Sequence, residues 1–161
     1  MADILVIGYG NELRGDDGIG PRVAEVVAAT NYPDVRVVRC FQLVPELAAD
    51  LAQVQRVIFV DGVAEARKTA VEVRSLSPAE TTDWSTHVAD PRTLLALAQA
   101  LYGRMPEAWY VLVSGENFDF GEGLSSAACD NVQKAGERIR KLIVDCRAGG
   151  RSPCTSELSA S

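Results

Sequence analysis

Acidic side chains and a single histidine are the residues of this 161-residue chain best suited to chemistry. Asp16 and Asp17 lie in a glycine-rich stretch, residues 8–20, that joins an apolar run to a helical pattern. Asp61 ends another apolar run, and His87 is the only histidine in the chain. Because carboxylates and imidazole are common metal ligands, these residue types point to a metal site.

The glycine-rich stretch has the wrong charge for its usual ligand. A glycine-rich turn between a strand and a helix usually binds phosphate through backbone N–H groups. Here Asp16 and Asp17 occupy the place of the phosphate, so the charge suits a cation. The dinucleotide fingerprint fails because Leu13 replaces its third glycine, and no Gly-Lys-Ser/Thr triplet follows. A site of two histidines and one carboxylate is excluded because the chain has one histidine.

Each of these residues also has an ordinary structural role that the residue types leave open. Asp16 and Asp17 could complement the positive N-terminus of the next helix, which is worth about 0.3–1 kcal/mol each. Asp61 could form a turn at the end of its strand. A lone histidine before a helix, such as His87, is more often hydrogen-bonded than a ligand.

Apolar runs alternate with helical patterns along the chain. We expect strands at residues 3–8, 35–40, 56–61, 71–76 and 109–114, and helices at 21–30, 45–53, 90–102 and 124–146. Strands separated by helices predict an α/β fold, a mainly parallel sheet with helices on both faces. Ligands bind such sheets at the carboxyl ends of the strands. We therefore expect Asp17, Asp61 and His87 to reach one edge of the sheet.

Length, composition and charge limit the class of protein. Residues 1–146 are expected to form a single domain, and residues 147–161, rich in Gly, Ser and Pro, a disordered tail. The net charge of -6 argues against non-specific nucleic-acid binding. Apolar stretches fall well short of the ~20 residues of a membrane span. The four scattered cysteines and the lack of a secretory signal predict a cytoplasmic protein.

The glycine-rich stretch resembles a known family signature. Gly8-x-Gly10-Asn11-x-Leu13-x-x-Asp16-Asp17-Gly18-x-Gly20 is similar to the motif of the [NiFe]-hydrogenase maturation endopeptidases, and the similarity runs from about Ile4 to Cys146. The resemblance implies a protease that removes a C-terminal extension from the hydrogenase large-subunit precursor after nickel insertion. It implies a three-layer α/β/α sandwich around a five-stranded mixed sheet with one antiparallel strand, for which residues 71–76 are the candidate.

The same resemblance implies the site. By position, Asp17, Asp61 and His87 match the family's metal ligands and are the expected catalytic residues, although many members have Glu in place of Asp17. The nickel is expected to be carried by the substrate precursor, which would complete an unfinished ligand set. Whether the metal or a carboxylate activates the attacking water stays open. Asp16 is expected to hold the loop, and Asn11 to supply a backbone or oxyanion contact.

One region departs from the common family pattern. Residues 39–47 lack the Asp-Gly-Gly-Thr-like turn, and together with residues 108–112 and 118–122 they resemble the subgroup that serves the bidirectional NAD(P)-reducing hydrogenase. Gln42 and Glu46 are expected to replace the missing substrate contacts. Two other classes stay open: a nucleotide-binding doubly wound module, and a non-catalytic nickel or hydrogenase assembly chaperone. The oligomeric state is not indicated by the sequence.

Overall fold

The computed structural model describes residues 3–64, 69–85 and 90–149. Its strands are β1 (Ile4–Tyr9), β2 (Val35–Cys40), β3 (Arg56–Val63), β4 (Val71–Leu76) and β5 (Glu107–Ser114). Its α-helices are α1 (Ile19–Ala28), α2 (Leu47–Leu51), α3 (Pro91–Tyr102) and α4 (Ser126–Gly149), and a short 3-10 helix, η1 (Gly15–Gly18), precedes α1.

The strands form one mixed sheet in the order β2-β1-β3-β5-β4. β1, β2, β3 and β5 are parallel to their neighbours, and β4 pairs antiparallel with β5. This confirms the predicted five-stranded sheet with residues 71–76 as its antiparallel strand. The chain leaves β1 toward β2 on one side and returns to β3 on the other, so a crevice is expected at the carboxyl ends of β1 and β3.

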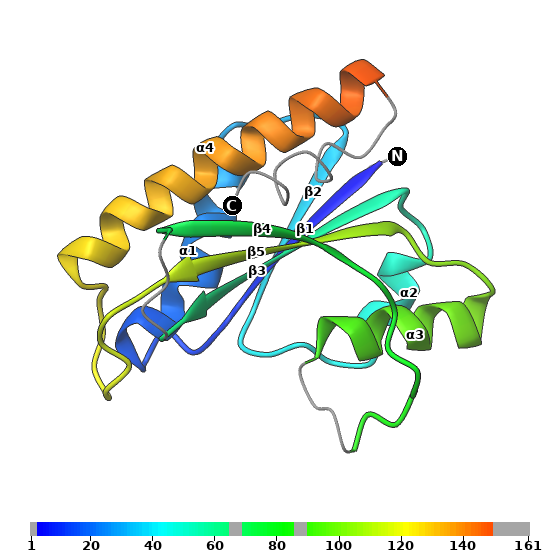
Figure 1. Ribbon diagram of the computed structural model, residues 1–161, viewed down its shortest axis with the longest axis horizontal. Coiled ribbons are helices and arrows are strands. Elements are labelled where there is room, and N and C mark those ends of the chain that lie inside the picture. The colour runs from blue at the N-terminus through cyan, green and yellow to red at the C-terminus, as the bar shows by residue number, and fades with distance from the viewer. Residues whose placement is uncertain (1–2, 65–68, 86–89, 150–161) are drawn as a thin grey trace.

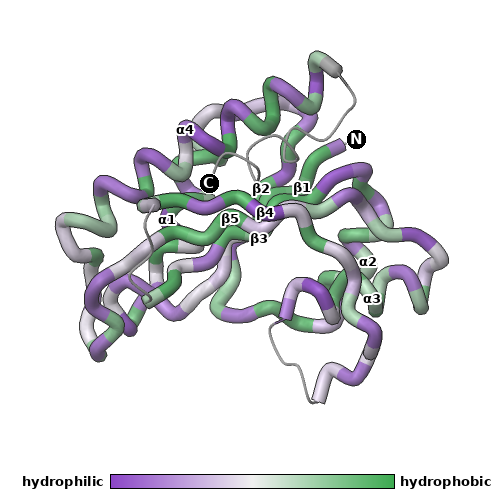
Figure 2. The backbone as a smooth tube through the Cα atoms, viewed as in Figure 1, coloured by the Kyte–Doolittle hydropathy of each residue, from purple (hydrophilic) through white to green (hydrophobic). Residues whose placement is uncertain are grey.

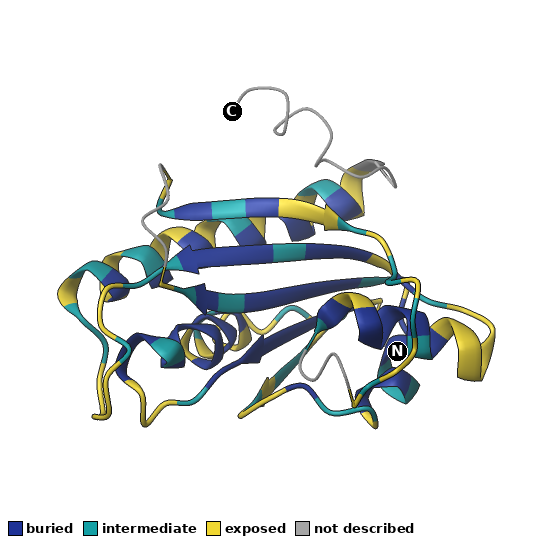
Figure 3. Cartoon of the chain, turned by 60° about the horizontal axis from the view of Figure 1, so that its bottom comes forward, coloured by how far each residue is buried: buried dark blue, intermediate teal, exposed yellow. Residues whose placement is uncertain are grey.

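Helices cover both faces of the sheet, which gives the predicted three layers (Figure 1). α1 and α4 lie on one face, and α2 and α3 on the other. The central strands are buried along almost their whole length (Figure 3). Hydropathy follows the same division, with apolar segments gathered in the sheet (Figure 2). Among the helices of the described ranges, none has the length and apolarity required to cross a bilayer.

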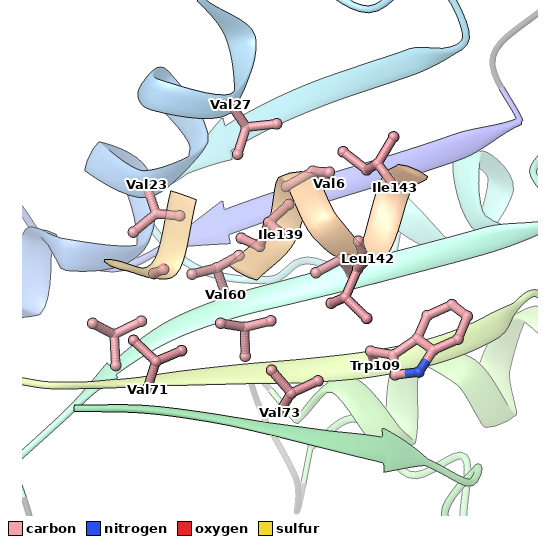
Figure 4. Packing of buried hydrophobic residues seen from close by; sticks show 14 of the residues in the cluster. Val6, Val23, Val27, Val60, Val71, Val73, Trp109, Ile139, Leu142 and Ile143 are labelled. Atoms are coloured by element: carbon pink, nitrogen blue, oxygen red, sulfur yellow. The ribbon is translucent and has the colours of Figure 1, made fainter. Parts of the chain in front are cut away.

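Each face of the sheet carries its own core. The first core packs α1 and α4 against one face, and Figure 4 shows Val23 and Val27 of α1 and Ile139 of α4 meeting the strand valines. Trp109 is its largest side chain and is 1% exposed. The second core joins α2 and α3 to the opposite face through Leu5, Ile7, Phe59, Leu47, Leu51, Leu94 and Leu95. Alternate residues of each buried strand serve the two cores, as the period of two requires.

Two glycines let α1 lie against β1 with backbone contact. A Cβ on Gly8 would come 2.1 Å from the carbonyl oxygen of Gly20, and one on Gly20 would come 2.2 Å from that of Tyr9. No side chain fits at such distances, so this part of the glycine-rich motif is explained by packing. The close approach fixes where η1, and therefore Asp16 and Asp17, stands above the end of β1.

Several predicted boundaries differ from the structure by one to three residues. α1 begins two residues early, at Ile19, because η1 leads directly into it. β3 continues past Asp61 to Val63, because it pairs with β5 up to Ser114.

Helix α4 also extends into the segment 147–161 that is predicted from the sequence to be a disordered tail. α4 continues to Gly149, and the Arg147 guanidinium hydrogen-bonds Asp34 and lies 4.7 Å from the centre of the Tyr32 ring. These long-range contacts explain why the helix does not stop at Cys146. Residues 150–161 lie outside the described residues.

The close approach of α1 and β1 predicts a large cost for a single methyl group. We expect Gly8→Ala to lower the free energy of unfolding by about 3 kcal/mol or more, because the new Cβ meets backbone that cannot move alone. Gly103→Ala is the matched control. Gly103 has φ +73 and open space around it, so the same change there should cost only about 1–2 kcal/mol. Urea titrations measure both, and equal costs would contradict the packing explanation.

Candidate active site

Asp16 is the buried residue that joins the loops at the carboxyl edge of the sheet. Its side chain is 0% exposed. It accepts hydrogen bonds from the backbone N–H groups of Glu116 (2.7 Å), Asn117 (3.0 Å) and Ser125 (2.8 Å), and from the Ser125 hydroxyl (2.7 Å). The Asp16 N–H in turn donates to the Asn117 carbonyl at 2.7 Å. The carboxylate therefore ties the loop after β1 to the loop between β5 and α4, as expected from the sequence.

The surroundings of Asp16 keep it ionised. Burial by itself would raise the pKa of this carboxyl, but the hydrogen bonds from Asn117, Ser125 and Glu116 outweigh burial and lower the pKa. Space for Asp16 comes from two glycines, Gly62 on β3 and Gly115 directly after β5. A Cβ on Gly115 would lie 2.7 Å from that of Asp16, and one on Gly62 would lie 2.7 Å from the Asp16 carbonyl oxygen. Asp16 is thus a structural anion and not a group that meets a ligand.

The N–H groups of Asn11 and of residues 13–17 in the glycine-rich loop are hydrogen-bonded within the protein. The N–H of Asn11 donates to Asp17 Oδ2 at 2.8 Å, and that of Leu13 donates to Asn11 Oδ1 at 2.9 Å. The N–H groups of residues 14–17 all donate to backbone carbonyls. A phosphate cradle needs several N–H groups directed at the ligand. These are already satisfied within the protein, so the loop lacks the donors that a nucleotide-binding module would need.

Asp17 and Asp61 lie near one another at the carboxyl ends of β1 and β3, where the topology predicts a crevice. Asp17 is partly buried in η1, and Asp61 is partly buried near the end of β3. Burial raises the pKa of Asp61, and the nearby charge of Asp17 raises it further, while hydrogen bonds from Tyr110 and Tyr9 oppose these effects. The resulting pKa is about 6. The structure thus places two of the three predicted site residues side by side.

Two tyrosine hydroxyls, those of Tyr9 and Tyr110, form a hydrogen-bonded group with Asp61. The Tyr110 hydroxyl donates to Asp61 Oδ2 at 3.1 Å. The hydroxyls of Tyr9 and Tyr110 are 2.6 Å apart and share a hydrogen bond. Burial and the charge of Asp61 raise the pKa of both tyrosines above the usual range. Both therefore stay protonated as donors at neutral pH.

Sequence analysis did not single out these tyrosines. Tyr110 pairs with Phe59 in the sheet, and Asp61 is two residues further along β3, so Tyr110 and Asp61 point to the same face. Ile7 also pairs with Phe59, which puts Tyr9 on that face. The alternation of side chains along each strand could have placed these tyrosines beside Asp61. That inference requires the strand order and register, which only the structure supplies.

The third predicted site residue, His87, lies outside the described residues. Asp90 begins α3 by accepting a hydrogen bond from the Arg92 N–H at 2.9 Å. The charge of Asp90 contributes to the raised pKa of Tyr110, so the start of α3 lies near the same edge. His87 is three residues earlier in the chain. Its place in the site stays a prediction.

The donor set at the crevice suits a cation. Asp17 and Asp61 are adjacent carboxylates, and the ion pairs found among the described residues involve neither of them. A bound cation would relieve their mutual repulsion. In residues 3–64, 69–85 and 90–149 no group of three His, Cys, Asp or Glu side chains is arranged as a metal site. Two carboxylates alone form an incomplete ligand set for a metal ion.

Comparison with solved structures gives the class of protein. The [NiFe] hydrogenase maturation protease HycI from Thermococcus kodakarensis has 22% sequence identity and a TM-score of 0.69, with 87% of this chain and 91% of that chain covered. The HybD protease from the same organism has 26% identity and a TM-score of 0.64, covering 88% and 99%. The hydrogenase maturating endopeptidase HybD from E. coli has 23% identity and a TM-score of 0.68, covering 92% and 94%.

These likenesses show that the chain has the fold of the [NiFe]-hydrogenase maturation proteases, and the predicted resemblance to that family is confirmed at this level. No protein-family model matches the sequence, and no curated protein matches it significantly. The solved structures therefore give this chain a maturation-protease-like fold.

The two buried acids predict stability changes of opposite sign. The pKa of Asp61 is raised to about 6, so its ionised form lowers stability at pH 7 by up to about 3 kcal/mol, and this cost disappears as pH falls through 6 toward 4. Asp61→Asn should therefore raise the melting temperature at pH 7 by several degrees and leave it nearly unchanged at pH 4.

Asp16→Asn is the matched comparison. The pKa of Asp16 is lowered, so its contribution is present above about pH 4 and is lost as pH falls toward the lowered pKa. This variant should melt well below wild type at pH 7, and the difference should shrink in acid. Thermal melts at both pH values test the pair. A destabilised Asp61→Asn at pH 7 would contradict the assignment of a costly buried charge.

Proposed function

We propose that this protein is an endopeptidase that removes the C-terminal extension of a [NiFe]-hydrogenase large-subunit precursor. The observation that carries the proposal is the pair Asp17 and Asp61, held at the crevice of a fold shared with hydrogenase maturation proteases. The partner is the precursor, and its nickel is the cation that the two carboxylates meet. The hydrogenase type suggested by residues 39–47 is the bidirectional NAD(P)-reducing one.

Nickel enters this reaction as part of the substrate. Asp17, Asp61 and His87 would supply the ligands that the precursor lacks, so only a nickel-loaded precursor completes the set. Cleavage would then report that nickel insertion has occurred. The shorter side chain of Asp17, where many family members have Glu, is held by the Asn11 N–H at 2.8 Å.

The chain's own groups define how water can be activated. Asp61 is partly buried, has a raised pKa of about 6 and accepts a hydrogen bond from Tyr110 at one oxygen. A carboxylate with a pKa in this range is mostly ionised at neutral pH and still accepts a proton, which suits a general base. When nickel is bound it supplies a Lewis acid that polarises the scissile carbonyl or the water. Asp61 serves either route only in its ionised form.

We place the reaction in the cytoplasm. Among the described residues, Cys40, Cys129 and Cys146 form no disulfide, as is usual in a reducing compartment. Burial raises the pKa of the Cys40 and Cys146 thiols, which makes them poor nucleophiles. We therefore assign the chemistry to the carboxylates and not to Cys40 or Cys146.

A cleavage assay tests the proposed function. Nickel-loaded precursor incubated with the wild-type protein should lose its C-terminal extension, as seen by mass spectrometry, and nickel-free precursor should stay intact. Asp17→Asn and Asp61→Asn should abolish processing, because each removes one ligand charge. Asp130→Asn, an exposed acid on α4, is the matched control and should process normally. A precursor that is bound but never shortened would favour an assembly chaperone, and equal processing of both precursors would contradict nickel gating.

Substitutions at His87 test the nitrogen donor. His87→Ala and His87→Gln should both lose processing, because neither side chain supplies the imidazole nitrogen that a nickel ligand needs. If His87 only tethers the segment before α3 by a hydrogen bond, glutamine should restore processing while alanine does not. Cleavage rates and circular dichroism melts of both variants separate these outcomes. Near wild-type processing by His87→Gln would remove His87 from the ligand set.

A further inference from the structure

Three large apolar side chains lie exposed on the loops around the crevice. Leu13 is 52% exposed, Phe41 is 63% exposed and Phe120 is 86% exposed. Leu13 follows β1, Phe41 follows β2, and Phe120 lies between β5 and α4. A single exposed apolar residue is ordinary on a protein surface, but a group of them beside a polar site marks an interaction surface. We call Leu13, Phe41 and Phe120 the apolar rim.

The apolar rim is continuous along one edge of the molecule. The Gly121 N–H donates to the Leu13 carbonyl at 2.8 Å, so the segment that carries Phe120 runs beside Leu13. Leu13 and Phe41 line one hollow of about 310 Å³. On its other side, Leu13 borders a second hollow of about 270 Å³ that includes Leu124. Leu13 is therefore a ridge between two recesses, each of a size that accepts an apolar side chain.

The apolar rim is also continuous with the proposed site. Asn11 lines the hollow between Leu13 and Phe41, and its N–H is the donor to Asp17. The segment of Phe120 belongs to the loop that Asp16 binds through Glu116 and Asn117. A protein whose scissile bond reaches Asp17 must therefore cover the loops that bear the rim.

The charges on the same loops specify the partner further. Four exposed acids surround the rim, namely Glu12, Glu116, Asp119 and Glu122. The exposed cations nearby are Arg14 on the loop after β1 and Arg39 on β2, and Arg39 is ion-paired with Glu25. Acids therefore predominate even without Asp17 and Asp61. Complementary charge favours a partner surface that is positive around its apolar contacts.

We propose that the apolar rim docks the hydrogenase precursor next to its scissile bond, by receiving apolar side chains of a positively charged precursor segment. This inference rests on the proposed function, because it takes the precursor as the partner. The rim would supply binding affinity and would fix where the precursor segment lies, while Asp17 and Asp61 act on the bound segment. Exposed apolar side chains in recesses are the kind of contact that carries most of the energy of a protein interface.

The test compares rim variants with matched variants elsewhere. Phe41→Ser, Phe120→Ser and the double variant remove rim side chains. Leu101→Ser and Tyr102→Ser are the controls, because these residues are 62% and 52% exposed at the far end of α3, next to the amino end of β5. Nickel-loaded precursor is the probe, with initial rates giving kcat and KM and surface plasmon resonance giving Kd.

The double variant should raise KM and Kd about tenfold, as expected for interface anchors, and leave kcat near the wild-type value. The controls should match wild type. Phe120→Ser, at 86% exposure, is the variant least able to disturb folding, and melts check that all variants fold.

The outcomes separate the inference from the proposed function. Unchanged KM and Kd in folded rim variants overturn the docking role, while shortening of the precursor by wild type leaves the proposed function standing. If wild type neither binds nor shortens the precursor, both are overturned. Sedimentation analysis tests the remaining alternative, in which a second copy of this chain occupies the rim. A wild-type dimer that becomes a monomer in the rim variants would make the rim a contact between copies of this chain and overturn docking of the precursor.

Discussion

The buried carboxylate of Asp16 is the interaction on which the rest of the edge depends. It accepts four hydrogen bonds from the loop that precedes α4 and has no exposed surface. A buried charge is costly unless its hydrogen bonds are complete, and here the N–H groups of three residues and one hydroxyl complete them. Because Asp16 holds η1 in place, it also fixes the position of the neighbouring Asp17, whose charge acts on Asp61 of β3.

Asp61 is a second carboxylate of this edge, and its ionised form is disfavoured by its surroundings. Burial and the charge of Asp17 raise the pKa of Asp61, and Tyr110 compensates only in part. Protein sites commonly retain such costs where a ligand will relieve them. Asp16, which is buried, and Asp61, which is partly buried, therefore have opposite effects on stability. The ionised form of Asp16 stabilises the fold, whereas the ionised form of Asp61 lowers its stability.

Much of the fold follows from the sequence, because local signals agree with the tertiary structure. The bounds of β2 and β4 match the expected residues 35–40 and 71–76, where alternation and flanking turn residues are clear. Neighbouring elements extend further than expected where distant contacts support them. β3 gains residues by pairing with β5, and α4 continues to Gly149 where Arg147 meets Asp34. Such contacts join residues far apart in the chain and leave no local pattern.

The site was predictable to a different extent. The family motif pointed to Asp17 and Asp61, and the parallel strands brought them to one edge. The residue types alone do not distinguish Asp16 from Asp17, because two adjacent identical residues have the same local signal. Their difference arises from the space that Gly62 and Gly115 leave for Asp16. The position of Tyr9 and Tyr110 beside Asp61 is set by the register of the sheet, which cannot be read from the sequence.

The internally satisfied glycine loop has a consequence for the energetics of recognition. Each N–H from residue 13 to residue 17 is already hydrogen-bonded, so the loop loses little conformational entropy when a partner arrives. The conformational entropy lost on binding is then almost entirely that of the partner segment. A segment already shaped by its own bound metal has less freedom left to lose than an empty one. Selection between them could therefore operate through entropy even before any ligand bond forms.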